Sequence, residues 1–100
     1  MNSITAIALK EKIENTEDFQ LIDVREPYEH EAFNIGGRLI PLNEINQHID
    51  AIATHKPVII YCRKGIRSQI AIQRLQQKLP FTNLVNLIGG MEAWQKEFGV

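Results

Sequence analysis

A short apolar segment that leads through a tight turn into a helix constrains the fold of this chain more than any other feature. Val58 to Tyr61 is uninterruptedly apolar and rich in β-branched side chains, which predicts a buried strand. From Ser68 to Leu79, Ala71 and Leu75 recur at the spacing of one face of an amphipathic helix. The sequence therefore predicts a strand–turn–helix unit with Cys62 on the turn.

Strand-like and helix-like segments alternate along the rest of the chain. We expect strands near Ile4 and over 19–24, 39–40, 58–61 and 84–87. We expect helices over 6–15 with Thr5 as the N-cap, over 43–52 with Asn43 as the cap, over 68–79, and after Gly89-Gly90 with Met91, Trp94 and Phe98 inward. Residues 25–30 predict a loop with a helical turn. This alternation predicts an α/β domain around a mostly parallel sheet, in which ligands bind where strands end and helices begin. Cys62 lies at such a point.

Length and composition indicate one ordinary globular domain, residues 1–100. No secretory signal is visible at the N-terminus, and the longest uninterrupted apolar run is Val58 to Cys62, too short to span a bilayer. We therefore expect a cytoplasmic protein. The single cysteine excludes a disulfide framework and a cysteine-rich metal site, and the scattered histidines lack metal-ligand spacing, so we expect no metal and no cofactor.

Charge is distributed unevenly along the chain. Residues 1–50 hold ten acidic and four basic side chains, whereas residues 51–91 hold six basic side chains and no acidic one. The basic residues are Lys56, Arg63, Lys64, Arg67, Arg74 and Lys78. The block is centred on Cys62 and predicts attraction of a small anion or an acidic partner, although chance placement on solvated faces explains Lys56, Arg74 and Lys78 equally well. No long basic stripe with interleaved aromatics is present, which argues against nucleic-acid binding.

The turn at Cys62 has the features of an anion site. The first amides of a helix lack intrahelical partners, and three cations (Arg63, Lys64 and Arg67) follow the cysteine closely. Gly65 lets the backbone take a positive φ. These features favour the nucleophilic thiolate. The alternative is a buried structural cysteine. Ser68 is expected either to donate a hydrogen bond to the anion or to cap the following helix.

A thiolate in such a turn could serve sulfur transfer, phosphate-ester hydrolysis or thiol redox exchange. Hydrolysis normally needs an acid for the departing alkoxide, and residues 51–91 contain no carboxyl group, although Asp23, Glu26 or Glu92 could fold into the site. Sulfur transfer from thiosulfate releases sulfite, which leaves without a proton. Redox exchange usually employs a second cysteine, and none is present. Sulfur transfer therefore fits best.

Four segments resemble the rhodanese family of sulfurtransferases, in order and over nearly the whole chain. They are Leu21–Glu26 with Glu29, Phe33–Gly37 with Ile40–Leu42, Cys62–Ser68, and Leu87–Trp94. The resemblance implies a five-stranded, mostly parallel sheet between two helical layers, with Cys62 as the sulfur-carrying nucleophile. It suggests that Arg67 binds the anionic part of the donor, with the amides of Arg63, Lys64, Gly65, Ile66, Arg67 and Ser68 around the sulfur. One departure is that Asn34 stands where the family commonly has histidine, and one neighbouring residue is absent.

The resemblance implies a donor such as thiosulfate or a persulfide, and an acceptor such as cyanide or a thiol, including a protein thiol. A sulfur-relay module that docks another protein remains an alternative, with the exposed Arg63 and Lys64 setting partner choice. A cysteine phosphatase or arsenate reductase is a further alternative, but such enzymes resemble C-x5-R, whereas four residues separate Cys62 from Arg67 here. We expect Asp23 and Arg25 to form structural ion pairs at helix ends, the alternative being that they orient the cysteine loop.

Overall fold

A five-stranded parallel sheet forms the centre of the computed structural model, which describes all of residues 1–100. The strand order is β1-β5-β4-β2-β3, and every neighbouring pair is parallel. The strands are β1 (Asn2–Ile4), β2 (Gln20–Asp23), β3 (Arg38–Leu39), β4 (Val58–Tyr61) and β5 (Leu84–Leu87). β4, whose four residues are all buried, lies in the middle of the sheet, so the segment that leads to Cys62 is the best-protected strand.

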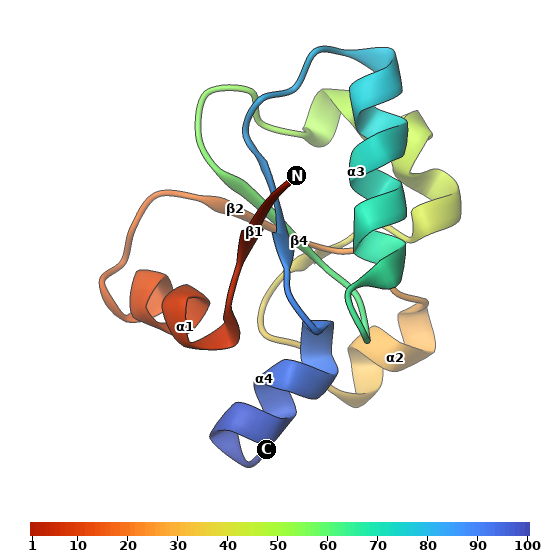
Figure 1. Cartoon of the computed structure of the whole chain (residues 1–100). Coiled ribbons are helices and arrows are strands. Elements are labelled where there is room, and N and C mark those ends of the chain that lie inside the picture. The colour runs from red at the N-terminus through yellow and green to blue at the C-terminus, as the bar shows by residue number, and fades with distance from the viewer.

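Helices cover both faces of the sheet, as Figure 1 shows. They are α1 (Ala6–Glu14), α2 (Pro27–Ala32), the 3₁₀ helix η1 (Leu42–Ala51), α3 (Ile66–Lys78) and α4 (Gly90–Phe98). α1 and α4 pack on one face, and η1 and α3 pack on the other. The predicted fold class, a three-layer α/β/α rhodanese-like arrangement, is confirmed.

The two faces of the sheet have different cores. The face under η1 and α3 is filled mainly by aliphatic side chains, among them Ile45, Ile60 and Leu75. The face under α1 and α4 contains the larger side chains Tyr61, Met91 and Trp94, the last in edge contact with Phe98 at 4.7 Å between ring centroids. Trp94 is 7% exposed, which confirms its predicted place in the core.

Two helix starts differ from the sequence predictions. η1 has Pro41 rather than Asn43 as its N-cap, because the Leu42 amide still bonds to the Val24 carbonyl beside β2 and the helix begins immediately afterwards. α3 begins at Ile66, with Gly65 as its N-cap in the left-handed conformation, so the prediction that Ser68 caps this helix is wrong. By contrast, Thr5 caps α1 as predicted and accepts a hydrogen bond from the Ala8 amide at 3.1 Å.

The loop before β3 is held by a local turn at Asn34. The Asn34 side chain accepts from the Gly36 amide at 2.8 Å and donates to the His30 carbonyl at 3.0 Å. A side chain at Gly37 would clash with the Tyr61 ring, since an added Cβ would lie 2.6 Å from Cε1. The loop therefore packs closely against the Tyr61 side chain of β4.

None of the helices combines the length and the apolar character needed to cross a bilayer. The cytoplasmic location stays a prediction.

Candidate active site

Cys62 follows directly after β4, at the carboxyl end of the central strand. Cys62 is only 1% exposed, and its sulfur lies against the turn that begins α3. Gly65 adopts a φ of +91°, as the sequence predicted, and its amide donates to the Cys62 Sγ at 3.0 Å. A backbone amide that points at a sulfur stabilises negative charge on it. The turn thus holds the cysteine in an anion-accepting environment despite its burial.

The start of α4 braces the cysteine turn from outside. The Met91 amide donates to the Cys62 carbonyl and the Glu92 amide to the Arg63 carbonyl, each at 2.9 Å. This close approach needs glycine at position 90, where an added Cβ would lie 2.7 Å from the Arg63 carbonyl oxygen. Figure 1 shows the turn between α2 and the start of α4. The amides of another helix therefore fix the position of the cysteine backbone.

The sulfur opens onto a small hollow of about 230 Å³ lined by Cys62, Arg63, Lys64, Ile66 and Arg67. A larger hollow of about 580 Å³ lies elsewhere, between β2 and residues 50–56, and contains no cysteine. Because the chemistry needs a nucleophile, we assign the candidate active site to the smaller hollow. The structure brings the predicted residues Cys62, Arg63, Lys64, Ile66 and Arg67 together there, whereas Gly65 and Ser68 reach the sulfur from behind.

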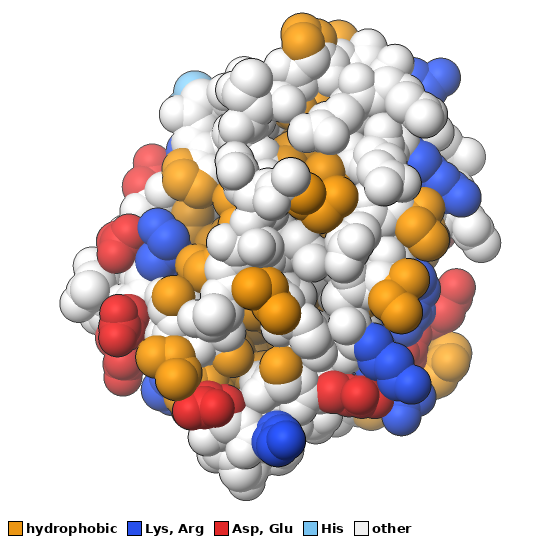
Figure 2. Space-filling model, in the orientation of Figure 1, with side chains coloured by type: hydrophobic (Ala, Val, Ile, Leu, Met, Phe, Trp, Pro, Cys, Tyr) orange, Lys and Arg blue, Asp and Glu red, His pale blue; other side chains and the backbone are white.

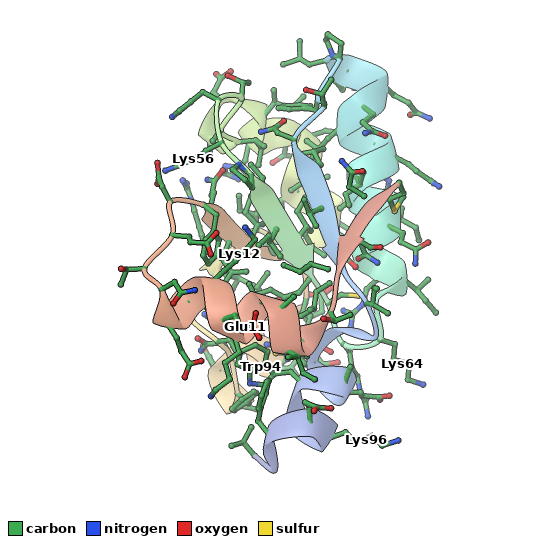
Figure 3. The ribbon with its side chains drawn as sticks, turned by 60° about the vertical axis from the view of Figure 1, so that its left-hand side comes forward. Glu11, Lys12, Lys56, Lys64, Trp94 and Lys96 are labelled. Carbon is green, nitrogen blue, oxygen red and sulfur yellow. The ribbon has the colours of Figure 1, made fainter.

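Acidic side chains from other segments neutralise two of the three cations around the turn. Arg67 forms a bidentate pair with Glu29 of α2, with N–O distances of 2.7 and 2.9 Å. Arg63 pairs with Glu92 at 3.2 Å. Lys64 has no acidic partner, and Figure 3 shows it projecting away from the ribbon. Within the positive block that the sequence suggested, Lys56, Arg63 and Arg67 therefore have acidic partners, whereas Lys64, Arg74 and Lys78 do not. Figure 2 shows blue and red side chains side by side.

The Glu29–Arg67 pair changes the ionisation of both partners. The hydrogen bonds from Arg67 lower the pKa of Glu29 from its usual value of 4.5 to about 2. The same contact raises the pKa of Arg67. Near neutral pH, Glu29 is thus a carboxylate without a proton to give, and Arg67 keeps its charge beside the hollow.

The wall behind the sulfur consists of neutral polar groups. The Ser68 hydroxyl lies 3.4 Å from the Cys62 Sγ and donates to the Oδ1 of Asn86 in β5. Ser68 is fully buried and Asn86 is 4% exposed. The sequence analysis missed Asn86. The sequence does contain a signal for Asn86, because a single asparagine side chain in the otherwise apolar strand Leu84–Leu87 needs a buried hydrogen-bond partner.

Asp23 and Arg25 form a separate cluster at the end of β2. Both are buried, and the Asp23 carboxylate accepts from the Arg25 guanidinium at 2.9–3.1 Å and lies 2.9 Å from the His30 Nδ1. Arg25 also donates to the Phe33 carbonyl at the C-cap of α2, at 2.6 Å. Neither side chain lines the hollow at Cys62. The contacts agree with the expected ion pair at a helix end.

Residues 5–97 match the Rhodanese-like domain family. This chain belongs to that family. It is 34% identical over 97 residues to the "Sulfurtransferase" of Allochromatium vinosum, covering 96% of this chain and 90% of that protein. It is 47% identical over 76 residues to the uncharacterized protein YqhL of Bacillus subtilis, covering 75% of this chain and 60% of that protein. A rhodanese-like domain protein from Staphylococcus aureus shares the fold with a TM-score of 0.85 at 32% identity, covering 94% of this chain and 91% of that one.

The chain spans only part of some relatives, 60% of the length of YqhL and 49% of the putative sulfur carrier protein YrkF, also from Bacillus subtilis. The activities of those longer proteins are therefore not attributed to this chain.

Proposed function

We propose that this protein is a sulfurtransferase in which Cys62 carries a sulfane sulfur from an anionic donor, such as thiosulfate or a persulfide, to a thiol or cyanide. The observation that carries the proposal is the Gly65 amide donating to the Cys62 Sγ at 3.0 Å, beside a hollow lined by Arg67. A nucleophilic sulfur, a donor for its negative charge and a cation for the incoming anion thus lie together.

The proposed first step forms one S–S bond and breaks another. The Cys62 thiolate attacks the outer sulfur of thiosulfate, the bond between the two thiosulfate sulfurs breaks, and its electron pair leaves with sulfite. No proton is transferred. In the second step a thiolate or cyanide attacks the outer sulfur of the Cys62 persulfide, and the electron pair returns to Sγ. The product of the first step is an anion, which the turn amides and Arg67 would stabilise.

The acids near the turn support sulfur transfer over phosphate-ester hydrolysis. Glu29 does reach the site from a distant segment, but Arg67 holds the pKa of this carboxyl at about 2, so it cannot protonate an alkoxide near neutral pH. Glu92, the other nearby carboxylate, pairs with Arg63 on the surface. Sulfite leaves without a proton, so the first half of sulfur transfer meets no such obstacle.

A test follows from the single cysteine of the chain. Incubation with thiosulfate, followed by intact-mass measurement, should show a gain of one sulfur atom, and added cyanide should remove it as thiocyanate. Cys62→Ser should show neither change. If a panel of sulfane-sulfur donors leaves the mass of the folded, alkylatable protein unchanged, the proposal is wrong.

A sulfur relay between proteins is the second candidate, because apolar side chains lie open near the hollow. Ile66 lines it and is 62% exposed, and Tyr28, next to Glu29 in α2, is 73% exposed. Such a rim suits a protein carrying its own thiol. Sulfur delivery to a protein thiol that is faster than thiocyanate formation would favour this candidate, and Tyr28→Ser, which removes exposed apolar surface without adding charge beside the hollow, should then slow only the delivery to protein.

A further inference from the structure

We propose that Asn86 is a positioning residue for the reaction at Cys62. The Asn86 side chain would hold the Ser68 hydroxyl so that this hydroxyl accepts a hydrogen bond from the neutral Cys62 thiol and donates one to the thiolate. The inference deepens the proposed function and rests on it, because it concerns the charge state of the same sulfur.

Three side chains from three different elements form a buried line behind the hollow. Cys62 follows β4, Ser68 lies in the first turn of α3, and Asn86 lies in β5, where its backbone pairs with Ile60. Their exposed fractions are 1%, 0% and 4%. Ser68 lies 3.4 Å from the Cys62 Sγ and bonds to the Asn86 Oδ1. Since the line is buried, its polar atoms depend on one another for hydrogen bonds.

The number of protons on this line limits what it can stabilise. A serine hydroxyl has one proton, and here Ser68 directs it to Asn86. The contact between Ser68 and Cys62 can then form only if the thiol donates to the Ser68 Oγ. The observed arrangement therefore suits the neutral thiol. A thiolate has no proton to donate, so it needs Ser68 to turn its proton toward the sulfur.

An asparagine permits that exchange without leaving a buried group unpaired. When the thiol proton leaves to water, Ser68 releases the Asn86 Oδ1 and donates to the sulfur. Rotation of the amide by half a turn then presents Nδ2, which carries two protons, to the Ser68 Oγ. Asn86 also borders a second hollow of about 230 Å³, lined as well by Met1, Ser3, Gln69, Ile88 and Gly89, and this space would accommodate the rotation. The two hollows share no residue.

The experiment compares two substitutions through the pH dependence of Cys62 alkylation by iodoacetamide. Asn86→Asp introduces a group that accepts hydrogen bonds and adds negative charge, so it should retain the Ser68 proton and lower the alkylation rate at neutral pH roughly tenfold or more. Asn86→Leu leaves the sulfur as the only acceptor for Ser68 and should change the rate less than about threefold. In a Ser68→Ala background, Asn86→Asp should lose most of its effect, because a charge that acted on the sulfur directly would not need the Ser68 hydroxyl. The charged groups near the sulfur, Arg63, Lys64, Arg67, Glu29 and Glu92, stay the same in every variant.

Asn83→Asp is the matched control. Its side chain bonds to the Ala53 and Lys56 carbonyls at 2.7 and 2.8 Å, just before β5 and at the opposite end of that strand from Asn86. This change should lower stability and leave the alkylation profile unchanged. Equal shifts in Asn86→Asp and Asn86→Leu, a similar shift in Asn83→Asp, or an Asn86→Asp effect that persists in full without the Ser68 hydroxyl would overturn the proposal. Alkylation needs no sulfur donor, so a failure of sulfur transfer would be recognised separately.

Discussion

Two guanidinium–carboxylate pairs near the carboxyl ends of β2 and β4 have the same chemistry and different surroundings. The pair of Asp23 and Arg25 is almost completely buried, with side-chain exposures of 0% and 6%. The pair of Glu29 and Arg67 is 12% and 32% exposed and borders the hollow at Cys62. The buried Asp23 carboxylate can only stabilise the fold. The Arg67 guanidinium faces the hollow and can bind an anion as well.

The contacts of the buried pair make it rigid. Asp23 also accepts from the Arg25 amide at 3.0 Å and contacts His30, and Arg25 also bonds to the Phe33 carbonyl. Burial lowers the pKa of Arg25, but the hydrogen bonds and charge of Asp23 outweigh this effect, so the pKa is raised overall. The pair joins the end of β2 to the end of α2, and α2 carries Glu29 to the active site. The scaffold pair therefore helps to position the exposed one.

The largest effect is expected from Asp23→Ala. Removing one partner of a buried pair leaves an unpaired charge and costs roughly 3–5 kcal/mol, a large share of the roughly 5–15 kcal/mol that stabilises a typical domain. Urea denaturation should show this loss. A loss no larger than the roughly 1–2 kcal/mol expected for the exposed pair would mean that the two pairs are equivalent in stability and would break the comparison.

A smaller free-energy effect, on activity rather than on stability, is expected from Arg67→Ala. The turn loses the charge that faces the incoming donor, and kcat/KM for thiosulfate should fall roughly a hundredfold, which corresponds to about 2.7 kcal/mol. Arg74→Ala is the matched control, since Arg74 lies in the same helix, has no acidic partner and donates a hydrogen bond to the Leu42 carbonyl at 3.4 Å. The double variant with Glu29→Gln shows whether the freed carboxylate repels the donor. If kcat/KM for thiosulfate is unchanged in Arg67→Ala, Arg67 stabilises the fold and does not bind the donor.

The smallest effect is expected from Glu29→Gln, and it should depend on pH. The pKa of Glu29 is about 2 in the folded protein and usually 4.5, so its carboxylate stabilises the fold fully above pH 4.5. This contribution, about 1–2 kcal/mol at neutral pH, decreases below pH 4.5 and disappears near pH 2. Urea denaturation of both proteins over this range should show their stabilities converging. Glu31→Gln, at an exposed position, serves as the control, and a constant difference across the range would contradict the assignment.

Local patterns in the sequence were sufficient to predict the sheet, most helices and the cysteine turn. The apolar run of β4 and the spacing of α3 follow from neighbouring residues alone. The sequence predicts a loop with a helical turn at residues 25–30, and in the structure that turn extends into the short helix α2 (Pro27–Ala32). Proline at the first helical position and the Glu29 side chain, which accepts from the Glu26 amide at 3.1 Å, explain that helix. Both features are local, so they mark the start of α2 in the sequence itself.

Pairings between distant segments could not be predicted in the same way. Glu29 and Arg67 are 38 positions apart, and Ser68 and Asn86 are 18 apart. Which carboxylate reaches which cation depends on the strand order, in which β4 lies between β2 and β5. The sequence therefore indicated a cationic turn, but it could not show that distant acids compensate most of the charge.

The bracing of the Cys62 and Arg63 carbonyls by the first amides of α4 has a consequence for how the protein is made. Ribosomes synthesise α4 after the cysteine and after α3, so a nascent chain holds its sulfur in an unfinished turn for some time. The reactive geometry would be completed only when α4 has emerged and docked.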